Sequence, residues 1–172
     1  MKARYAITRA RPRDVPALAA IERSASQLLR GHAPQSVLDE VTDDDTFRAA
    51  QADGRLWVAL ADDTPVGFAL VELLTADAPH LDEIDVDPLH GRRGLGTALV
   101  RAVCDWTARS GHRQITLTTF RMVPWNMPFY FRLGFEEVPA TELTPEQIAI
   151  VRDETARGLD PGARAVLRWR TR

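Results

Sequence analysis

The run from His90 to Thr97, His-Gly-Arg-Arg-Gly-Leu-Gly-Thr, combines residue types that suit the binding of a phosphate group. It lies between an expected strand and an expected helix, and the first N–H groups of a helix have no intrahelical partner and carry partial positive charge. Gly94 and Gly96 have no side chain that would hold a phosphate away from those donors, and Arg92 and Arg93 add fixed positive charge. We interpret the run as a pyrophosphate site; an ordinary strand-to-helix loop, with glycines for tight packing, is the alternative.

The spacing of the residues in this run excludes two common classes of nucleotide-binding site. A dinucleotide-binding fingerprint needs a third glycine where Leu99 stands, and a P-loop needs a lysine, whereas the single lysine of the chain is Lys2. The remaining pattern, Arg-Arg-Gly-x-Gly, resembles the acetyl-CoA pyrophosphate loop of the GNAT superfamily of N-acetyltransferases. That family usually has Gln or Arg at the first loop position, where this chain has Gly91, so Arg92 or Arg93 would supply the missing side-chain contact.

A second segment strengthens the resemblance. Residues Pro124–Phe135 are similar to a later motif of the same family, in which an Asn precedes Phe-Tyr and then Leu-Gly-Phe. The segment reads as a short helix that Asn126 can cap and that Gly134 can end in a left-handed conformation. Both motifs occur in the family's order, and the resemblance covers roughly Leu56 to Val138.

The resemblance implies acetyl transfer to an amine, which must lose a proton at a cost of about 4 kcal/mol at neutral pH. The strand from His80 to Asp87 is unusually acidic. Strand alternation places Glu83 and Asp85 on one face, and Asp82 on the other with the apolar residues of the strand. Because unpaired buried carboxylates are costly, some of these acids should border a solvated cleft. Glu83 is the expected base; Asp82, Asp85 and His80 are also candidates, and ion pairing of the acids with arginines at a sheet end is the alternative.

Other roles follow from the motif. The resemblance places Tyr130 near the thioester sulfur, where a phenol could protonate the leaving thiolate; a core aromatic is the alternative. Asn126 could bind the cofactor or serve as a plain helix cap, and N–H groups near Ile84 and Val86 could polarise the acetyl carbonyl. The expected catalytic residues are Glu83 and Tyr130, and the expected cofactor-binding residues are Ile84, Val86, Arg92, Arg93, Gly94, Leu95, Gly96, Thr97, Asn126 and Phe129.

Composition bounds the class of protein. A chain of 172 residues with 45% hydrophobic and 27% charged residues suits one soluble domain, residues 1–172, and a net charge of −2 gives no footprint for nucleic acid or an anionic membrane. Cys104 is the only cysteine, so no intrachain disulfide can form, and the histidines have no ligand spacing with it, so we expect no metal. Without a signal peptide or a transmembrane run, we expect a cytoplasmic location.

The expected elements alternate between strands and helices, which predicts an α/β (α+β) fold with a layered sheet. The GNAT resemblance implies a mixed, mostly antiparallel sheet in a single domain, with helices on both faces and the cofactor between two splayed strands. The expected strands are Tyr5–Arg9, Arg55–Ala61, Pro65–Leu74, Leu81–Val86, Gln114–Thr119 and Arg164–Trp169, and the expected helices are Asp14–Leu29, Val37–Ala52, Gly94–Ser110, a short one after Asn126, and Thr144–Arg157.

The resulting hypothesis is an acetyl-CoA-dependent N-acetyltransferase in which an amine attacks directly. A non-catalytic acyl-CoA-binding sensor or regulatory module on the same fold is the alternative, and a nucleotide-binding module of another fold is disfavoured by the missing lysine and glycine. We expect a small-molecule or peptide amine as acceptor, with no nucleic acid and no membrane as partner; a homodimer is compatible with the sequence. The regions before Asp53 and after Pro139 should line or cover the acceptor site, where their acids would suit a cationic amine.

Overall fold

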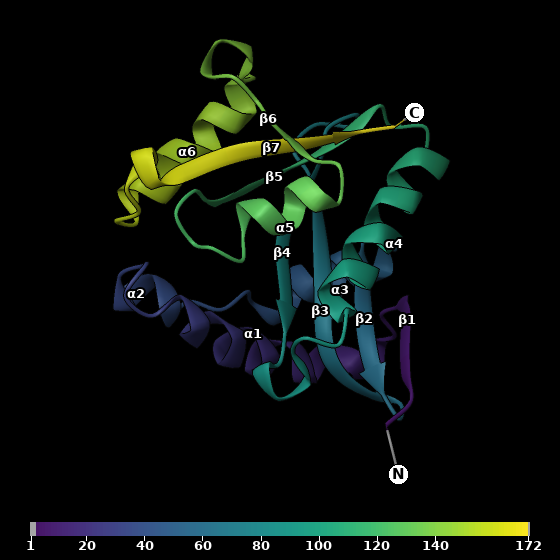
Figure 1. Ribbon diagram of the computed structural model, residues 1–172. Coiled ribbons are helices and arrows are strands. Elements are labelled where there is room, and N and C mark those ends of the chain that lie inside the picture. Colours follow the sequence, from purple (N-terminus) through teal and green to yellow (C-terminus); the bar gives the residue numbers. More distant parts are fainter. Residues whose placement is uncertain (1–2, 172) are drawn as a thin grey trace.

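A seven-stranded sheet with the order β1-β2-β3-β4-β5-β7-β6 runs through the molecule (Figure 1). The computed structural model describes residues 3–171. Neighbouring strands are antiparallel except β4 and β5, so the sheet is mixed and mostly antiparallel, as expected. The strands are β1 (Tyr5–Arg9), β2 (Leu56–Ala61), β3 (Thr64–Leu73), β4 (Pro79–Val86), β5 (Gln114–Phe120), β6 (Glu136–Glu137) and β7 (Arg164–Arg170).

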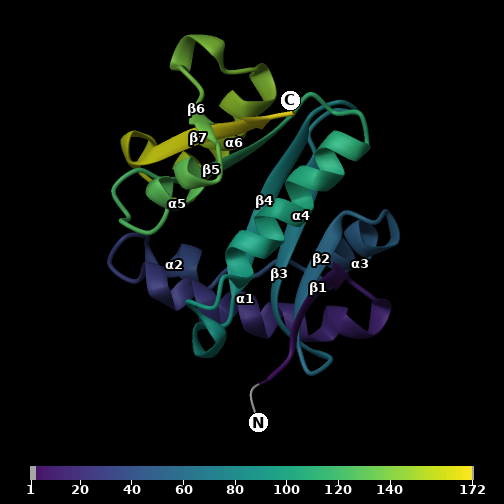
Figure 2. The same cartoon turned by 45° about the vertical axis from the view of Figure 1, so that its right-hand side comes forward.

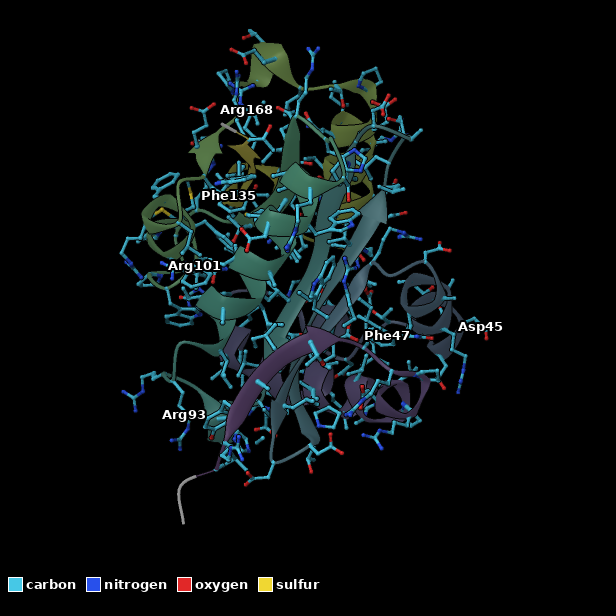
Figure 3. All side chains as sticks on the ribbon, turned by 90° about the vertical axis from the view of Figure 1, so that its right-hand side faces the viewer. Asp45, Phe47, Arg93, Arg101, Phe135 and Arg168 are labelled. Carbon is cyan, nitrogen blue, oxygen red and sulfur yellow. The ribbon has the colours of Figure 1, made fainter. Side chains whose placement is uncertain are left out.

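Helices cover both faces of this sheet. Figure 3 shows Phe47 of α3 and Arg101 of α4 on opposite sides of it. The α-helices are α1 (Leu18–Ser26), α2 (Gln35–Leu38), α3 (Asp44–Ala52), α4 (Leu95–Arg109), α5 (Met127–Arg132) and α6 (Pro145–Ala156), and the 3-10 turns are η1 (Pro12–Ala17), η2 (Gln27–Leu29), η3 (Pro88–His90), η4 (Ala140–Glu142) and η5 (Pro161–Ala163). The expected first helix is therefore split, and its opening turns, which contain Pro16, are 3-10.

The period-two alternation of β3 separates two buried clusters. Phe68 and Leu70 pack with η1, α1 and α3 on one face. Ala69 and Val71 pack on the other face in a cluster that includes α4 and Tyr130. The central strands are thus fixed by apolar packing on both sides, which gives the site a rigid floor.

β2 and β3 form a hairpin that turns between the two expected strands, Arg55–Ala61 and Pro65–Leu74. Asp62 and Asp63 have φ values of 46° and 72°, the left-handed conformation of the tight turns that suit strand twist. The expected helix from Thr144 begins with a capping box, since Thr144 and Gln147 bond each other's backbone at the start of α6. The sequence also predicts a strand that starts at Phe135, after the helix-ending Gly134. The strand found there, β6, has only two residues.

The join between β4 and β5 is very short. Their register contains the single pair His80↔Thr116, and the strands diverge beyond it. Figure 1 shows β5, β7, α5 and α6 on one side of this divergence, with β4, α1 and α2 on the other. Among residues 3–171, none of the helices combines the length and the apolar run that crossing a bilayer requires.

A candidate active site between the diverging strands

The divergence of β4 and β5 opens a cleft with a volume of about 1210 Å³. Its walls come from both strands, from the chain between α1 and α3, and from α5, the loop before α4, and α6. Figure 2 shows α4 lying across β3 and β4, with α5 beyond the divergence. Six of the expected site residues line the cleft: Glu83, Ile84, Val86, Arg92, Asn126 and Tyr130.

The loop before α4 presents a row of free donors. The six amide groups from Arg92 to Thr97 donate to no backbone or side-chain acceptor among residues 3–171. Gly94 is the N-cap residue in a left-handed conformation (φ 78°), and a Cβ added there would meet no other atom within 4 Å. Arg92 is also left-handed, with φ 55°, a conformation that costs energy outside glycine. Free amides, a helix N-terminus and open space above Gly94 form a site for an anion.

The remaining loop residues have different neighbours. Gly96 faces Phe129 of α5: a Cβ on Gly96 would lie 3.6 Å from that ring, an ordinary van der Waals contact. Arg93 is exposed, with its guanidinium 5.8 Å from the ring centroid of Tyr5, and Figure 3 labels it where α4 begins. Arg92 is exposed and lines the cleft, so the two arginines flank the loop from different sides.

Two α5 residues face the cleft with free polar groups. Asn126 occupies the N-cap position of α5, as expected, but its side chain makes no capping hydrogen bond and remains available to a ligand. Tyr130 is buried between Phe129 and Phe135, and its hydroxyl bonds to no described residue. Burial, followed by the charges of Glu83 and Asp85, raises the pKa of Tyr130 well above its usual value. The phenol is therefore protonated at neutral pH and can act only as a proton donor.

A β-bulge in β4 changes the faces of its acids. The register jumps from Val71↔Leu81 to Leu70↔Glu83, so Asp82 is an extra residue without a partner on β3. The expected placement of Asp82 beside Ile84 and Val86 is therefore wrong: the inserted residue turns Asp82 toward the face of Glu83. Alternation from Glu83 onward holds, which keeps Ile84 and Val86 on the opposite face.

Glu83 and Asp85 form a carboxyl pair. The two groups are close enough to shift each other's pKa, both line the cleft, and no donor in residues 3–171 bonds to either. Burial comes first and neighbouring carboxylates second in raising the pKa of both groups. Two carboxyl groups this close resist double ionisation, so the pair keeps at least one proton at neutral pH. Because the pKa of Asp85 is raised to about 8, a carboxylate formed in this pair readily accepts a proton.

The other candidate bases differ from this pair. The side chain of Asp82 is exposed to the cleft. The pKa of Asp82 is raised to about 6, mainly because the surrounding protein displaces water and secondly because of the charge of Glu72. His80 is buried against Thr116, and burial lowers its pKa to about 4, too weak a base for a reaction at neutral pH. Asp82, Glu83 and Asp85 form no ion pair in residues 3–171, so the alternative of arginine pairing at a sheet end is wrong.

Glu22 is a site residue that sequence reasoning missed. It is a buried carboxyl of α1 that lines the cleft and accepts hydrogen bonds from Thr42 N (2.9 Å) and Thr42 Oγ1 (3.1 Å). Its charge contributes to raising the pKa of both Glu83 and Asp85. The sequence does contain a signal for Glu22: it lies four residues after Leu18, within the apolar stripe of α1. An acid at such a position is costly to bury and therefore indicates a special role.

The edge of β4 offers further donors to the cleft. Asp87 N donates to Val66 O of β3, so alternation along the strand turns the N–H groups of Ile84 and Val86 away from β3 and toward the open side. Cys104 is buried in the core, where burial first and the charge of Asp105 second raise the pKa of its thiol to about 12. Within residues 3–171, no group of three or more His, Cys, Asp and Glu side chains lies close enough to hold a metal ion.

Comparison with known proteins places this geometry in context. Residues 18–135 match the family model described as "Acetyltransferase (GNAT) family". An uncharacterized N-acetyltransferase of Methanocaldococcus jannaschii is 30% identical over 101 residues, which are 55% of this chain and 41% of that protein. The match thus spans less than half the length of that curated relative.

Solved structures share the whole architecture. The PaiA N-acetyltransferase from Thermoplasma acidophilum, in complex with coenzyme A, has a TM-score of 0.76 at 16% identity and covers 98% of this chain and 99% of its own. The ribosomal-protein-S18-alanine N-acetyltransferase from Escherichia coli has a TM-score of 0.66 at 20% identity, covering 97% and 94%. At these identities the likeness shows a shared fold, and it confirms the expected sheet with helices on both faces.

Proposed function

This chain belongs to the GNAT family of acetyltransferases, and on that premise we propose that it transfers an acetyl group from acetyl-CoA to an amine by direct attack of the nitrogen on the thioester. The single observation that carries the cofactor assignment is the row of six unpaired amides from Arg92 to Thr97 at the N-terminus of α4. Coenzyme A is bound in the Thermoplasma acidophilum protein of the same fold, which supports the assignment. We further propose that residues 1–172 act as one N-acetyltransferase domain.

The pyrophosphate would bind these amides, because the loop leaves both the donors and the space above Gly94 free. Arg92 and Arg93 flank the loop and would add charge beside the phosphates. Asn126 would hydrogen-bond the cofactor, and Phe129 would pack beside it next to Gly96. The N–H groups of Ile84 and Val86 would bind pantetheine and polarise the acetyl carbonyl from the open edge of β4.

The acids and the phenol would handle the two protons of the reaction. The Glu83–Asp85 pair, when it carries a negative charge, would take a proton from the ammonium of the acceptor, directly or through water. The free nitrogen would attack the carbonyl carbon, forming the C–N bond as the C–S bond breaks. Tyr130 would donate its proton to the departing thiolate, and the proton lost by the nitrogen on amide formation would restore it through solvent.

Turnover decides between an enzyme and a sensor. We expect release of free CoA thiol from acetyl-CoA that depends on an added amine, in a screen of small amines, amino acids, aminoglycosides and peptide N-termini. The unbonded hydroxyl of Tyr130, a proton donor, and the Glu83–Asp85 pair, a proton acceptor, favour an enzyme over an acyl-CoA sensor. Tight acetyl-CoA binding without thiol release for any of these amines would favour the sensor instead.

A further inference from the structure

The part of the cleft away from the α4 loop is rich in carboxyl groups. Among residues 3–171, seven acidic residues and three arginines line the cleft. The acids come from α1, the chain before α3, β4 and α6, so they surround the opening from several sides. They are Glu22, Glu40, Asp82, Glu83, Asp85, Asp153 and Glu154, and the arginines are Arg92, Arg157 and Arg164.

The arginines on the acceptor side are already engaged. Arg164 donates to Glu154 at 2.8 and 3.0 Å, and Arg157 donates to Glu40 at 2.6 Å. The third, Arg92, belongs to the anion-binding loop. Subtracting Glu40 and Glu154 from the seven acids leaves five carboxyl groups without a cationic partner in the described residues.

These carboxyl groups set a requirement on the acceptor. A reacting amine must lose its charge, so it cannot balance the cleft at the moment of attack. A second ammonium on the same molecule keeps its charge and can pair with a carboxylate throughout the reaction. A carboxylate on the acceptor would find no free arginine and would be repelled. Leu28 and Trp125, which are 54% and 51% exposed and line the same cleft, suit a short alkyl chain.

Building on the transferase function proposed above, we propose that the acceptor is an alkyl diamine or longer oligoamine without a carboxylate. Its reacting nitrogen lies at the Glu83–Asp85 pair, which no other described residue bonds. Its second ammonium lies toward Asp82 and α6. Asp82 lies within range of the charges of Glu154 and Arg157 of α6, and Asp153 of the same helix also lines the cleft. Neither Asp82 nor Asp153 has an ion pair in residues 3–171.

A matched set of acceptors tests the proposal. We expect kcat/KM for 1,4-diaminobutane to exceed that for butylamine by roughly 10- to 100-fold, the effect of one charge-assisted hydrogen bond in a partly buried site. Ornithine, which adds a carboxylate to the same diamine, should fall below 1,4-diaminobutane by at least as much. Equal use of the three would overturn the acceptor proposal and leave acetyl transfer intact. Thiol release with none of them, nor with any amine of the wider screen, would instead overturn the transferase function.

A binding measurement with paired variants decides the matter independently of turnover. 1,4-Diaminobutane is titrated by calorimetry into the enzyme saturated with CoA. We expect its affinity to be about tenfold weaker for Asp153→Asn than for the parent, the effect of losing one hydrogen bond to a charged group at a partly exposed position. Glu146→Gln, on the same helix and outside the cleft, is the control and should bind like the parent. Binding of butylamine should not change in either variant. Equal diamine affinity in Asp153→Asn and the parent, or equal weakening in Glu146→Gln, would contradict the placement of the second ammonium.

Discussion

The Nδ1 atom of His80 lies 2.8 Å from the Oγ1 atom of Thr116, at the one register pair that joins β4 to β5. Both residues are buried, and burial keeps the imidazole uncharged by lowering the pKa of His80 to about 4. The bond therefore closes the sheet at the point from which the two strands diverge. This contact lies at the apex of the opening between β4 and β5.

Loss of the hydroxyl at this apex should destabilise the fold. Thr116→Val keeps the shape of the side chain but leaves a buried imidazole nitrogen without a partner, at a cost of about 1–3 kcal/mol in the free energy of unfolding. Thr116→Ser, which retains the hydroxyl, should lose clearly less. Urea denaturation of the three proteins measures the difference, and equal stability of the Val and Ser variants would show that the bond contributes nothing.

Removal of one phenolic hydroxyl should separate catalysis from binding. Tyr130→Phe changes little volume, so we expect kcat to fall by roughly 10²–10⁴-fold while acetyl-CoA affinity stays nearly unchanged. Steady-state kinetics together with a cofactor titration provide the two readouts. A kcat within a small factor of the parent would mean that Tyr130 serves packing, and that water protonates the thiolate.

The carboxyl pair should make the protein less stable as pH rises. The folded-state pKa values of Glu83 and Asp85 are raised above their unfolded values near 4, so the folded protein holds an extra proton whose contribution to stability is full below pH 4 and is lost as pH rises through the raised pKa values. His80, whose folded pKa is lowered to about 4, binds a proton only in the unfolded state up to about pH 7.5. It therefore adds a rise in stability with pH, which is the same in the parent and in Asp85→Asn. Asp85→Asn should therefore raise Tm at pH 8.5 by ~2–4 °C, for a gain on the order of 1 kcal/mol, and flatten the decline from pH 6.5. An unchanged slope of Tm against pH in Asp85→Asn would contradict the shared proton.

The same pair should govern the rate profile. Glu83→Gln retains shape but cannot accept a proton, so turnover should be slow at neutral pH and should recover partly toward the pKa of the amine itself, where free amine appears unaided. Acetyl-CoA affinity should not change. Asp82→Asn and Asp85→Asn, profiled with the same amine, are the comparison. A parent-like profile for Glu83→Gln beside a loss in one of the other two would move the base to that residue, and parent-like profiles for all three would mean that the enzyme works by positioning.

Local signals in the sequence predicted the anion loop and most of the elements. Gly94 adopts the left-handed turn that only its type favours, and the helix start that follows needs no distant partner. The bulge at Asp82 could not be predicted, because it exists only in the register of β4 against β3. Glu22 joins the acids through the packing of α1 on β4, and His80 meets Thr116 across 36 residues. Contacts of this kind join residues that are far apart in the chain. The periodicity of a single sequence does not indicate them.

The central claim is that the loop before α4 holds the pyrophosphate of acetyl-CoA, and calorimetric titration of acetyl-CoA tests it most directly. Gly94→Val adds a side chain to the open space above the free amides, and Gly111→Val is its matched control. Gly111 has nearly the same left-handed φ (81° against 78°) and equally open space, at the other end of the same helix. We predict at least about a tenfold loss of affinity, ~1.4 kcal/mol, in Gly94→Val and parent-like affinity in Gly111→Val. Parent-like affinity in a folded Gly94→Val variant would contradict the account.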